Sequence, residues 1–446
     1  MADWCDKEHY RLVWAVPSSI PRRRWRIAFL LGAGVVVNYF DRVNLSVAHS
    51  ALIATFAISN ITFGYLSAAY NWTYALCQLP VGVVLDRFGV RRVGRVSSFL
   101  WSVASFAASI APNLGAFFAA RLLLGIGEAP TFPGNAKAIG YWFPARERSS
   151  ATSIFDGSAK FASAIGVPLI GILLLKFGWR WSFAATGLVS FLYFLLFCYI
   201  YRDPDEDPYL TQQERDYILE KDAAAPILPA ETASLGYLIR QPKVIGITLG
   251  FGAYNYVFYL LLTWLPSYLS SALHIDLLHS FLYTGVPWLI GTASELLIGG
   301  WLVDRLLERG WNASRVQRVV LIGGTTMGLG IIVSAYSQTP ASALSWISIS
   351  LAGLSAASAV GWSVPSLIGP RGSVGTLAGI QNFSSQVSGI VAPIVTGYLV
   401  TARHSFGWAF GVAGIYLSIG ISAYIFLLGR LEKIPSQIPS QGQRGA

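Results

Sequence analysis

Two pairs of charged residues lie inside apolar stretches of this sequence. Asp41 and Arg42 lie within residues 25–48, and Arg121 and Glu128 lie within a second apolar stretch. A charged side chain is costly at the middle of a lipid bilayer, so it normally faces a polar cavity or a partner. A guanidinium can bind an anion through two parallel hydrogen bonds, and a buried carboxylate can exchange protons. These four residues therefore predict a site for a charged solute.

Helical spacing gives each of these residues a candidate role. Asn38, Asp41 and Arg42 are spaced i, i+3 and i+4, so they share one face of a helix. Arg121 and Glu128 are about 10 Å apart along a helix axis. We interpret Arg42 as the ligand for a substrate carboxylate, Asp41 and Glu128 as proton carriers, and Arg121 as the charge that tunes Glu128. The alternative is a fixed network of ion pairs that holds two helices together.

The composition indicates a polytopic α-helical membrane protein. The chain has 446 residues, of which 54% are hydrophobic and only 12% are charged, and its mean hydropathy is +0.53. A soluble protein of this length would carry far more charge. The net charge of +10 does not indicate a nucleic-acid partner, because the basic residues lie in short clusters between apolar stretches.

The sequence does not predict an enzyme. The three cysteines have no metal-binding spacing, the five histidines are scattered, and we find no catalytic triad or phosphate-binding loop. We therefore expect no metal site and no cofactor.

Apolar runs between glycines, prolines and charged residues predict twelve transmembrane helices. The long polar stretch at 202–242 is a predicted cytoplasmic linker between two six-helix bundles, residues 26–201 and 243–429. Residues 1–25 and 430–446 are then a cytoplasmic N-terminal segment and tail. The fourth helix is expected to kink at Pro130 and Pro133. The twelve helices are expected at residues 26–49, 61–85, 93–111, 114–142, 151–175, 181–201, 243–270, 280–303, 316–337, 341–365, 374–401 and 407–429.

Lysine and arginine are distributed unevenly among the predicted loops. With the N-terminus in the cytoplasm, the outer loops hold only Lys176, Arg180 and Arg403, while the inner loops hold the basic clusters. Cytoplasmic loops of membrane proteins are enriched in these two residue types. We therefore expect a multi-pass protein of the cell (inner) membrane with both termini in the cytoplasm, and we expect it to act as a monomer.

An internal repeat supports the division into halves. Residues 82–92 read Gly-Val-Val-Leu-Asp-Arg-Phe-Gly-Val-Arg-Arg and follow the second predicted helix, and residues 300–305 read Gly-Trp-Leu-Val-Asp-Arg at the equivalent place after the eighth. An Asp–Arg pair at a helix end can lock neighbouring helices and release them. We therefore expect gates at two pairs of residues, Asp86 with Arg87 and Asp304 with Arg305. The alternative is a pair of ordinary charge clusters at the membrane surface.

Residues 82–92 resemble the loop 2–3 motif of the major facilitator superfamily, and residues 144–150 resemble its loop 4–5 motif. The resemblance covers nearly the whole chain, residues 25–430. It implies an all-α membrane protein whose two six-helix bundles surround a central cavity that opens alternately to each side.

Four shorter segments carry a narrower resemblance. Residues 38–44, 76–80, 121–130 and 262–266 together are similar to the anion:cation symporter family, which includes bacterial carriers of hexuronates, galactonate, glucarate and phthalate. This resemblance implies uptake of a small organic anion, a carboxylate, usually with protons. It also implies substrate contacts for three residues that match positions in sugar-acid carriers, namely Tyr74, Trp362 and Asn382.

Other polar residues on the predicted helices can complete the cavity. Asn255 and Tyr259 are four residues apart in the seventh helix, and Gln386 lies on a polar face of the eleventh. Glu295 is a further acid within the eighth helix. Residues that are spaced in this way share a helix face, although packing between helices is the alternative for each of them.

The fifth predicted helix departs from the sugar-acid carriers. Ala159 stands where those carriers often have a glutamine that faces the sugar, and Lys160 follows it. Lys160 can pair with Asp156 at the i, i+4 spacing. This departure leaves a sugar acid, an aromatic acid and a short dicarboxylic acid open as substrates.

Two other functions remain open. One is a proton-driven exporter of drugs or metabolites on the same fold, because residues 157–171 partly match the Gly-rich motif that exporters carry in the fifth helix. Accumulation of labelled acids by whole cells separates an importer from an exporter. The other is a non-transporting membrane sensor, against which the lack of a large soluble domain argues.

Overall fold

The computed structural model describes residues 21–144, 147–219, 233–337, 339–370 and 373–436. Most of the predicted N-terminal segment (1–20), the middle of the linker (220–232) and the end of the tail (437–446) lie outside this part of the chain. The described residues form helices and no strand.

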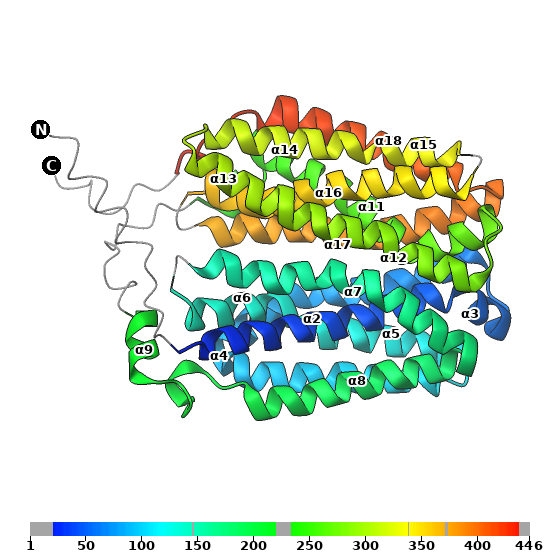
Figure 1. Ribbon diagram of the computed structural model, residues 1–446, viewed down its shortest axis with the longest axis horizontal. Coiled ribbons are helices and arrows are strands. Elements are labelled where there is room, and N and C mark those ends of the chain that lie inside the picture. Colours follow the sequence, from blue (N-terminus) through cyan, green and yellow to red (C-terminus); the bar gives the residue numbers. More distant parts are fainter. Residues whose placement is uncertain (1–20, 145–146, 220–232, 338, 371–372, 437–446) are drawn as a thin grey trace, which may run out of the picture.

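The helices form two layers, one from each half of the chain (Figure 1). In Figure 1 the first half lies below and the second half lies above. The first half contains α2 (Arg23–Val47), α3 (His49–Phe56), α4 (Asn60–Ser109), α5 (Leu114–Glu128), α6 (Thr131–Trp142), α7 (Arg148–Phe177) and α8 (Trp179–Ile200). The linker contains η2 (Pro204–Glu206), α9 (Gln212–Leu219) and α10 (Leu235–Leu238).

The second half repeats this arrangement and includes three π-helical segments, η3, η4 and η6. Its elements are α11 (Pro242–Ser267), η3 (Tyr268–Ala272), α12 (Leu277–Ser294), η4 (Glu295–Leu302), α13 (Val303–Glu308), α14 (Ala313–Gly328), α15 (Gly330–Ala335), α16 (Pro340–Ile368), α17 (Val374–Arg403), α18 (Gly407–Ser422) and η6 (Ala423–Leu428). The halves meet where α17 packs on α4, α12 on α7 and α11 on α2.

Each of the twelve predicted spans coincides with a helical segment, and local residues explain the differences at their ends. The second and third spans are the two arms of α4, which bends at Gly89 with a φ of 76°. Glycine adopts this positive φ without strain. The fourth span is interrupted between α5 and α6 at Pro130, because a proline has no N–H to donate to the preceding turn.

Length and composition alone identify eight membrane-spanning helices among the described residues, or up to nine if α3 and the start of α4 form one bent span. α5 and α6 are only 15 and 12 residues long. α2 carries Asn38, Asp41 and Arg42 within its apolar sequence. The eight helices are Ile154–Phe177, Trp179–Ile200, Pro242–Ala272, Leu277–Leu307, Ala313–Ala335, Pro340–Ile368, Val374–Arg403 and Gly407–Leu428.

The two bundles pack most closely at one end of the molecule. We call the end that carries α9 the linker end, and the opposite end, which carries α3, the far end (Figure 1). At the far end Ser46 Oγ donates to the carbonyl oxygen of Thr263 at 2.8 Å, and a Cβ on Gly397 would lie 2.5 Å from the carbonyl oxygen of Asn60. Toward the linker end, a Cβ on Gly82 or Gly379 would meet nothing within 4 Å.

Candidate functional site

Arg42 lies at the centre of the first bundle and forms a buried ion pair. Its Nε donates to Glu128 Oε2 at 3.1 Å, and its Nη2 donates to Asn38 Oδ1 at 2.8 Å. The exposed fractions of the Arg42 and Glu128 side chains are 6% and 0%. The predicted shared face of α2 therefore brings Arg42 and Asn38 together, and the end of α5 supplies the acid.

Three tyrosine rings surround the Arg42 guanidinium. Its Cζ lies 4.5 Å from the ring centre of Tyr39, 4.7 Å from that of Tyr70 and 5.5 Å from that of Tyr74. A cation above an aromatic face is stabilised by the ring electrons, most strongly where water is excluded. Tyr74, which the family resemblance indicated as a substrate contact, thus lies beside the predicted anion ligand.

Asp41 is buried on a different side of α2 and has hydroxyl partners. Ser105 Oγ donates to Asp41 Oδ1 at 2.7 Å, and Ser190 Oγ donates to Oδ2 at 2.9 Å. These hydroxyls come from α4 and α8, so Asp41 links three helices of the first bundle. A carboxyl group among hydroxyls can accept hydrogen bonds when ionised and can donate one when protonated.

Arg121 lies close to both acids, although its hydrogen bond is with the main chain. Its Nη1 donates to the carbonyl oxygen of Asp41 at 3.3 Å, and its guanidinium lies 5.6 Å from the ring centre of Tyr70. Within the described part of the chain, Arg121 Nε has no hydrogen-bond partner although it is buried. The direct partner of Glu128 is therefore Arg42, and Arg121 retains an unused donor.

The two arginines share a cavity between the bundles. The cavity has a volume of about 30 Å³, and its polar lining comes from α2, α4, α5 and α11. Tyr259, predicted as a cavity residue, lies in this lining together with Asn71 and Thr263. The described lining thus places two cations among neutral hydrogen-bonding groups, which suits the carboxylate end of a small anion.

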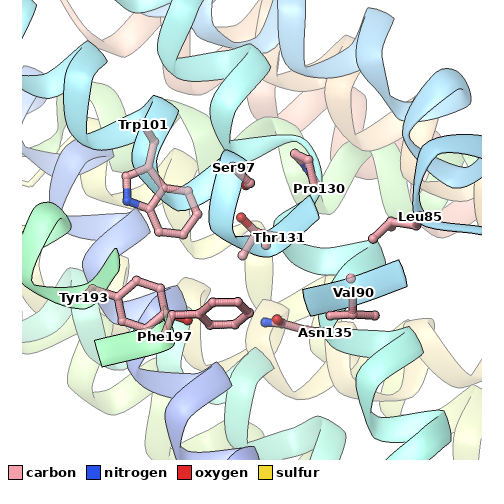
Figure 2. A pocket seen from close by; sticks show the side chains of 11 residues that line it. Leu85, Val90, Ser97, Trp101, Pro130, Thr131, Asn135, Tyr193 and Phe197 are labelled. Atoms are coloured by element: carbon pink, nitrogen blue, oxygen red, sulfur yellow. The ribbon is translucent and has the colours of Figure 1, made fainter. Parts of the chain in front are cut away.

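A second cavity of similar size lies inside the first bundle and has no charged lining residue. It lies between α4, α6 and α8, where Trp101 stacks on Tyr193 with ring centres 5.7 Å apart (Figure 2). Asn135, seven residues beyond Glu128, lines this second cavity (Figure 2). Because its lining is aromatic and neutral, it does not suit an organic anion.

The other predicted cavity residues of the second bundle lie at several depths. Trp362 is 40% exposed and packs on Phe251 at 5.0 Å between ring centres. Asn382 Nδ2 donates to Gln78 Oε1 at 3.4 Å and so bridges α17 and α4. Asn255 Nδ2 donates within its own helix to the carbonyl oxygen of Phe251 at 2.9 Å.

Gln386 belongs to the same central region. Its side chain is buried and lies close to Tyr259, which lines the cavity of the two arginines. Gln386 Oε1 has no partner within the described residues. An unpartnered buried acceptor beside the cavity can take a hydrogen bond from a bound molecule.

Lys160 and Glu295 form a second buried ion pair, which joins the two bundles. Lys160 Nζ lies 2.6 Å from Glu295 Oε2, and the exposed fractions of the two side chains are 4% and 6%. Lys160 Nζ also lies 3.4 Å from Ser358 Oγ. The sequence offered Asp156 as a partner at the i, i+4 spacing, whereas the direct ion pair is formed across the interface with the other bundle.

The four predicted gate residues lie toward the linker end. The side chain of Asp86 lies outside the described part of the chain, and the exposed Arg87 lies 5.3 Å from the ring centre of Phe88. Asp304 and Arg305 are both exposed at the start of α13. The gating role of these residues stays a prediction.

A buried ion network at the linker end was not predicted from the sequence. Arg24 Nε donates to Glu147 Oε2 at 2.7 Å, and Arg24 Nη1 donates to Glu214 Oε1 at 3.0 Å. Tyr217 Oη donates to Glu147 Oε1 at 2.6 Å. The network therefore fixes α9 of the linker to the start of α2 and to the loop before α7. The only signal in the sequence was the acidic character of the linker and the glutamate within residues 144–150.

The start of the linker makes a separate contact with the bend of α4. Arg91 pairs with Glu206, and Arg23 Nη2 pairs with Asp207 Oδ2 at 2.8 Å. Partial burial raises the pKa of the nearby Asp203 carboxyl, although a hydrogen bond from Tyr201 acts in the opposite direction.

Among the described residues, no group of three or more His, Cys, Asp or Glu side chains is placed to hold a metal ion.

This fold and this buried charge pattern define a polytopic membrane transporter. Residues 31–393 match the Major Facilitator Superfamily, and the chain belongs to this superfamily. It is a transporter and not an enzyme.

The chain is similar along nearly its whole length to bacterial transporters. It is 38% identical over 414 residues to the "Uncharacterized transporter YybO" of Bacillus subtilis (strain 168), covering 92% of this chain and 95% of the relative. It is 30% identical over 431 residues to the "Probable galactarate/D-glucarate transporter GarP" of Escherichia coli (strain K12), covering 93% and 96%. The second relative supports the narrower resemblance to the anion:cation symporter family.

The fold is also similar to solved transporter structures. The crystal structure of a D-xylose-proton symporter superposes with a TM-score of 0.71, covering 92% of this chain and 99% of that chain. The sequence identity is 17%, so this similarity concerns the fold. The all-α fold class with two six-helix bundles is thereby confirmed.

Proposed function

We propose that the protein is a secondary active transporter that takes up an organic carboxylate together with protons by alternating access. The observation that carries this proposal is the buried ion pair of Arg42 and Glu128 beside a polar cavity. An entering carboxylate can replace Glu128 as the partner of Arg42, because the guanidinium binds carboxylates in a bidentate geometry. Glu128 is then a buried carboxylate that has lost its cationic partner. Burial favours the protonated form of such a group, so Glu128 can take up a proton.

This exchange keeps the charge in the closed cavity nearly constant. In the empty carrier the Arg42 guanidinium is balanced by the Glu128 carboxylate, and in the loaded carrier it is balanced by the substrate. Uncompensated charge at mid-membrane is costly in either state. Uptake is therefore expected to require one proton for each carboxylate that displaces an internal acid.

Arg121 and Asp41 extend the same arrangement. Arg121 Nε is an unused donor in the cavity, so it can add a hydrogen bond to the bound carboxylate. Asp41 lies next to Arg42, and its main-chain carbonyl oxygen accepts a hydrogen bond from Arg121. We assign Asp41 as a second proton carrier and Arg121 as the cation that responds to the protonation of both acids.

The packing of the bundles suits a carrier that is open toward the linker end. Contacts across the interface are tight at the far end, whereas a Cβ on Gly82 or Gly379 would meet nothing within 4 Å. The loop distribution of Lys and Arg supports an inner-membrane protein whose linker and both termini lie in the cytoplasm. In this orientation, a carrier open toward the linker end would face inward, and we propose that it works as a monomer.

The name of one relative narrows the panel of substrates to test. The relative from Escherichia coli is named a probable galactarate/D-glucarate transporter, and both of these substrates are six-carbon sugar diacids. The experiment measures the thermal stability of the purified protein with glucarate, gluconate, glucuronate, phthalate and succinate. At least one acid should raise the unfolding temperature, because a ligand that binds only the folded state stabilises it.

Uptake is then measured in proteoliposomes with that acid. An inward proton gradient should drive accumulation, and a protonophore should abolish it. Stabilisation by none of the acids would reject an organic anion as the substrate. Transport that runs only out of an intact cell would favour the exporter, and binding without any flux would favour a sensor.

A further inference from the structure

The Lys160–Glu295 ion pair lies on the inner faces of both bundles. Lys160 belongs to α7 of the first bundle, and Glu295 begins η4 of the second. Ser358 on α16 adds a hydroxyl oxygen 3.4 Å from Lys160 Nζ. Three elements from two bundles therefore meet at one ammonium group. The proposed proton-coupled binding at Arg42 and Glu128 uses none of these residues.

Further titratable groups around this ion pair come from α7, α11 and α2. Asp156, on the same helix as Lys160, lies within electrostatic range of both Lys160 and Glu295. Tyr254 on α11 and Tyr39 on α2 lie within electrostatic range of Lys160. The cluster therefore brings one cation together with two acids.

Tyr39 connects this cluster to the carboxylate site. Its ring lies 4.5 Å from the Arg42 guanidinium, and it is also within electrostatic range of Lys160. Both cations belong to the first bundle, and each is paired with a buried glutamate. The arrangement at Lys160 thus repeats the arrangement at Arg42, with the acid supplied by the opposite bundle.

Packing alone does not explain a buried ion pair at this position. The cost of removing two charges from water often exceeds their attraction, and apolar residues of similar size commonly stabilise a protein as well or better. The ammonium has three donors, of which the described contacts engage Glu295 and Ser358. These two contacts among the described residues leave one donor of the ammonium for a further acceptor.

We propose that Lys160 is a second anion-binding residue with Glu295 as its resident counter-ion, and that the substrate carries two anionic groups. One group binds to Arg42 and the other binds to Lys160. When the second group arrives, Glu295 leaves Lys160 and takes up a proton, so the net charge of the cluster does not change. This inference rests on the proposed function and adds the substrate class, a small diacid, together with a second proton.

The test compares matched acids that differ in one anionic group. Glucarate and gluconate form one pair, and adipate and hexanoate form the other. Affinities are measured by thermal shift and by competition for uptake with purified full-length protein. The wild type should bind the diacid of at least one pair more tightly. Lys160→Gln should weaken diacid binding roughly 10- to 100-fold, as expected for the loss of a charge-assisted hydrogen bond, and should change monoacid binding less than about two-fold.

Two further variants separate binding from folding. Glu295→Gln removes the competing carboxylate and should strengthen diacid binding at neutral pH. The double variant Lys160→Met with Glu295→Leu removes both charges, should keep the unfolding temperature, and should lose the preference for diacids. The proposal is overturned if Lys160→Gln weakens both acids of a pair equally, or if the double variant still prefers the diacid.

Failure of this inference differs from failure of the proposed function. If wild-type protein binds the monoacid at least as tightly as the matching diacid in both pairs, the second anion site is rejected while carboxylate transport stands. If no organic acid binds to the wild type, carboxylate transport itself is rejected.

Discussion

Glu128 ends α5 directly beside Arg42 on α2, and Arg42 Nε donates to Glu128 Oε2 at 3.1 Å. The two residues are 86 positions apart in the chain, and both are buried. A substrate carboxylate and Glu128 would therefore compete for the same guanidinium. This competition gives the first two predictions.

Arg42→Lys should weaken the binding of an identified organic acid roughly 10- to 100-fold, because an ammonium cannot replace the bidentate guanidinium. The measurement is a titration of the unfolding temperature with the acid. Arg403→Lys, a change at an exposed arginine, is the matched control and should bind normally. Wild-type affinity in Arg42→Ala would show that Arg42 is not the carboxylate ligand.

Glu128→Gln should abolish uphill accumulation driven by a proton gradient, yet it should preserve exchange of substrate across the membrane. The amide fills the same space but cannot carry a proton, so binding and proton movement become uncoupled. Asp41→Asn is expected to act in the same direction. In the wild type, uptake should rise as the external pH falls, because protonation releases Arg42 for the substrate. Uptake driven by sodium and insensitive to a protonophore would contradict the proton coupling.

Asp86→Asn should slow turnover while it leaves the thermal stability and substrate affinity of the protein nearly unchanged. Asp86 precedes Arg87 where the first arm of α4 ends, and the repeated Asp–Arg pair is the basis for expecting a gate there. Asp304→Asn should have the related effect in the second half. Initial rates in proteoliposomes, compared with binding titrations, measure this difference. A variant that transports at the wild-type rate would argue against a gate.

The sequence predicted contacts within a helix better than contacts between helices. The spacing correctly predicted a shared face for Asn38 and Arg42, because the geometry of one helix is fixed by its own hydrogen bonds. Asp41 was expected on the same face, but its carboxylate instead accepts hydrogen bonds from Ser105 and Ser190. The same spacing offered Asp156 to Lys160, but the direct ion pair is with Glu295, 135 positions further along the chain. Packing between the bundles decides which faces of distant helices meet. The spacing of residues in a single sequence does not indicate these contacts.

The linker illustrates the same limit outside the apolar spans. Its acidic residues were predicted as a polar cytoplasmic stretch, yet Glu214 is fully buried against Arg24. A charge loses its water only where a partner and a surrounding surface are supplied by other elements. Here α2 and the loop before α7 supply them, so composition alone could not distinguish this glutamate from its exposed neighbours.

Glu214→Ala should destabilise the protein by about 3–5 kcal/mol, because it leaves Arg24 buried with a partner missing. The exposed fractions of the Arg24 and Glu214 side chains are 3% and 0%, so water cannot readily replace the lost carboxylate. The thermal unfolding midpoint measures the effect. Asp216→Ala, on the exposed side of the same helix, is the matched control and should change stability little. Equal stability of the two variants would mean that α9 does not clamp the first bundle.

Gly397→Ala should shift the carrier toward a state that is open at the far end. A Cβ at this position would lie 2.5 Å from the carbonyl oxygen of Asn60, so the methyl group separates α17 from the start of α4. Because Ser46 touches Thr263 across the same end, a cysteine that replaces Ser46 reports the opening through its rate of labelling from outside. Gly379→Ala places the same methyl group on the same helix where nothing lies within 4 Å, and it should label like the parent. Labelling that is equally slow in both variants would show that this close approach of α17 to α4 does not keep the far end shut.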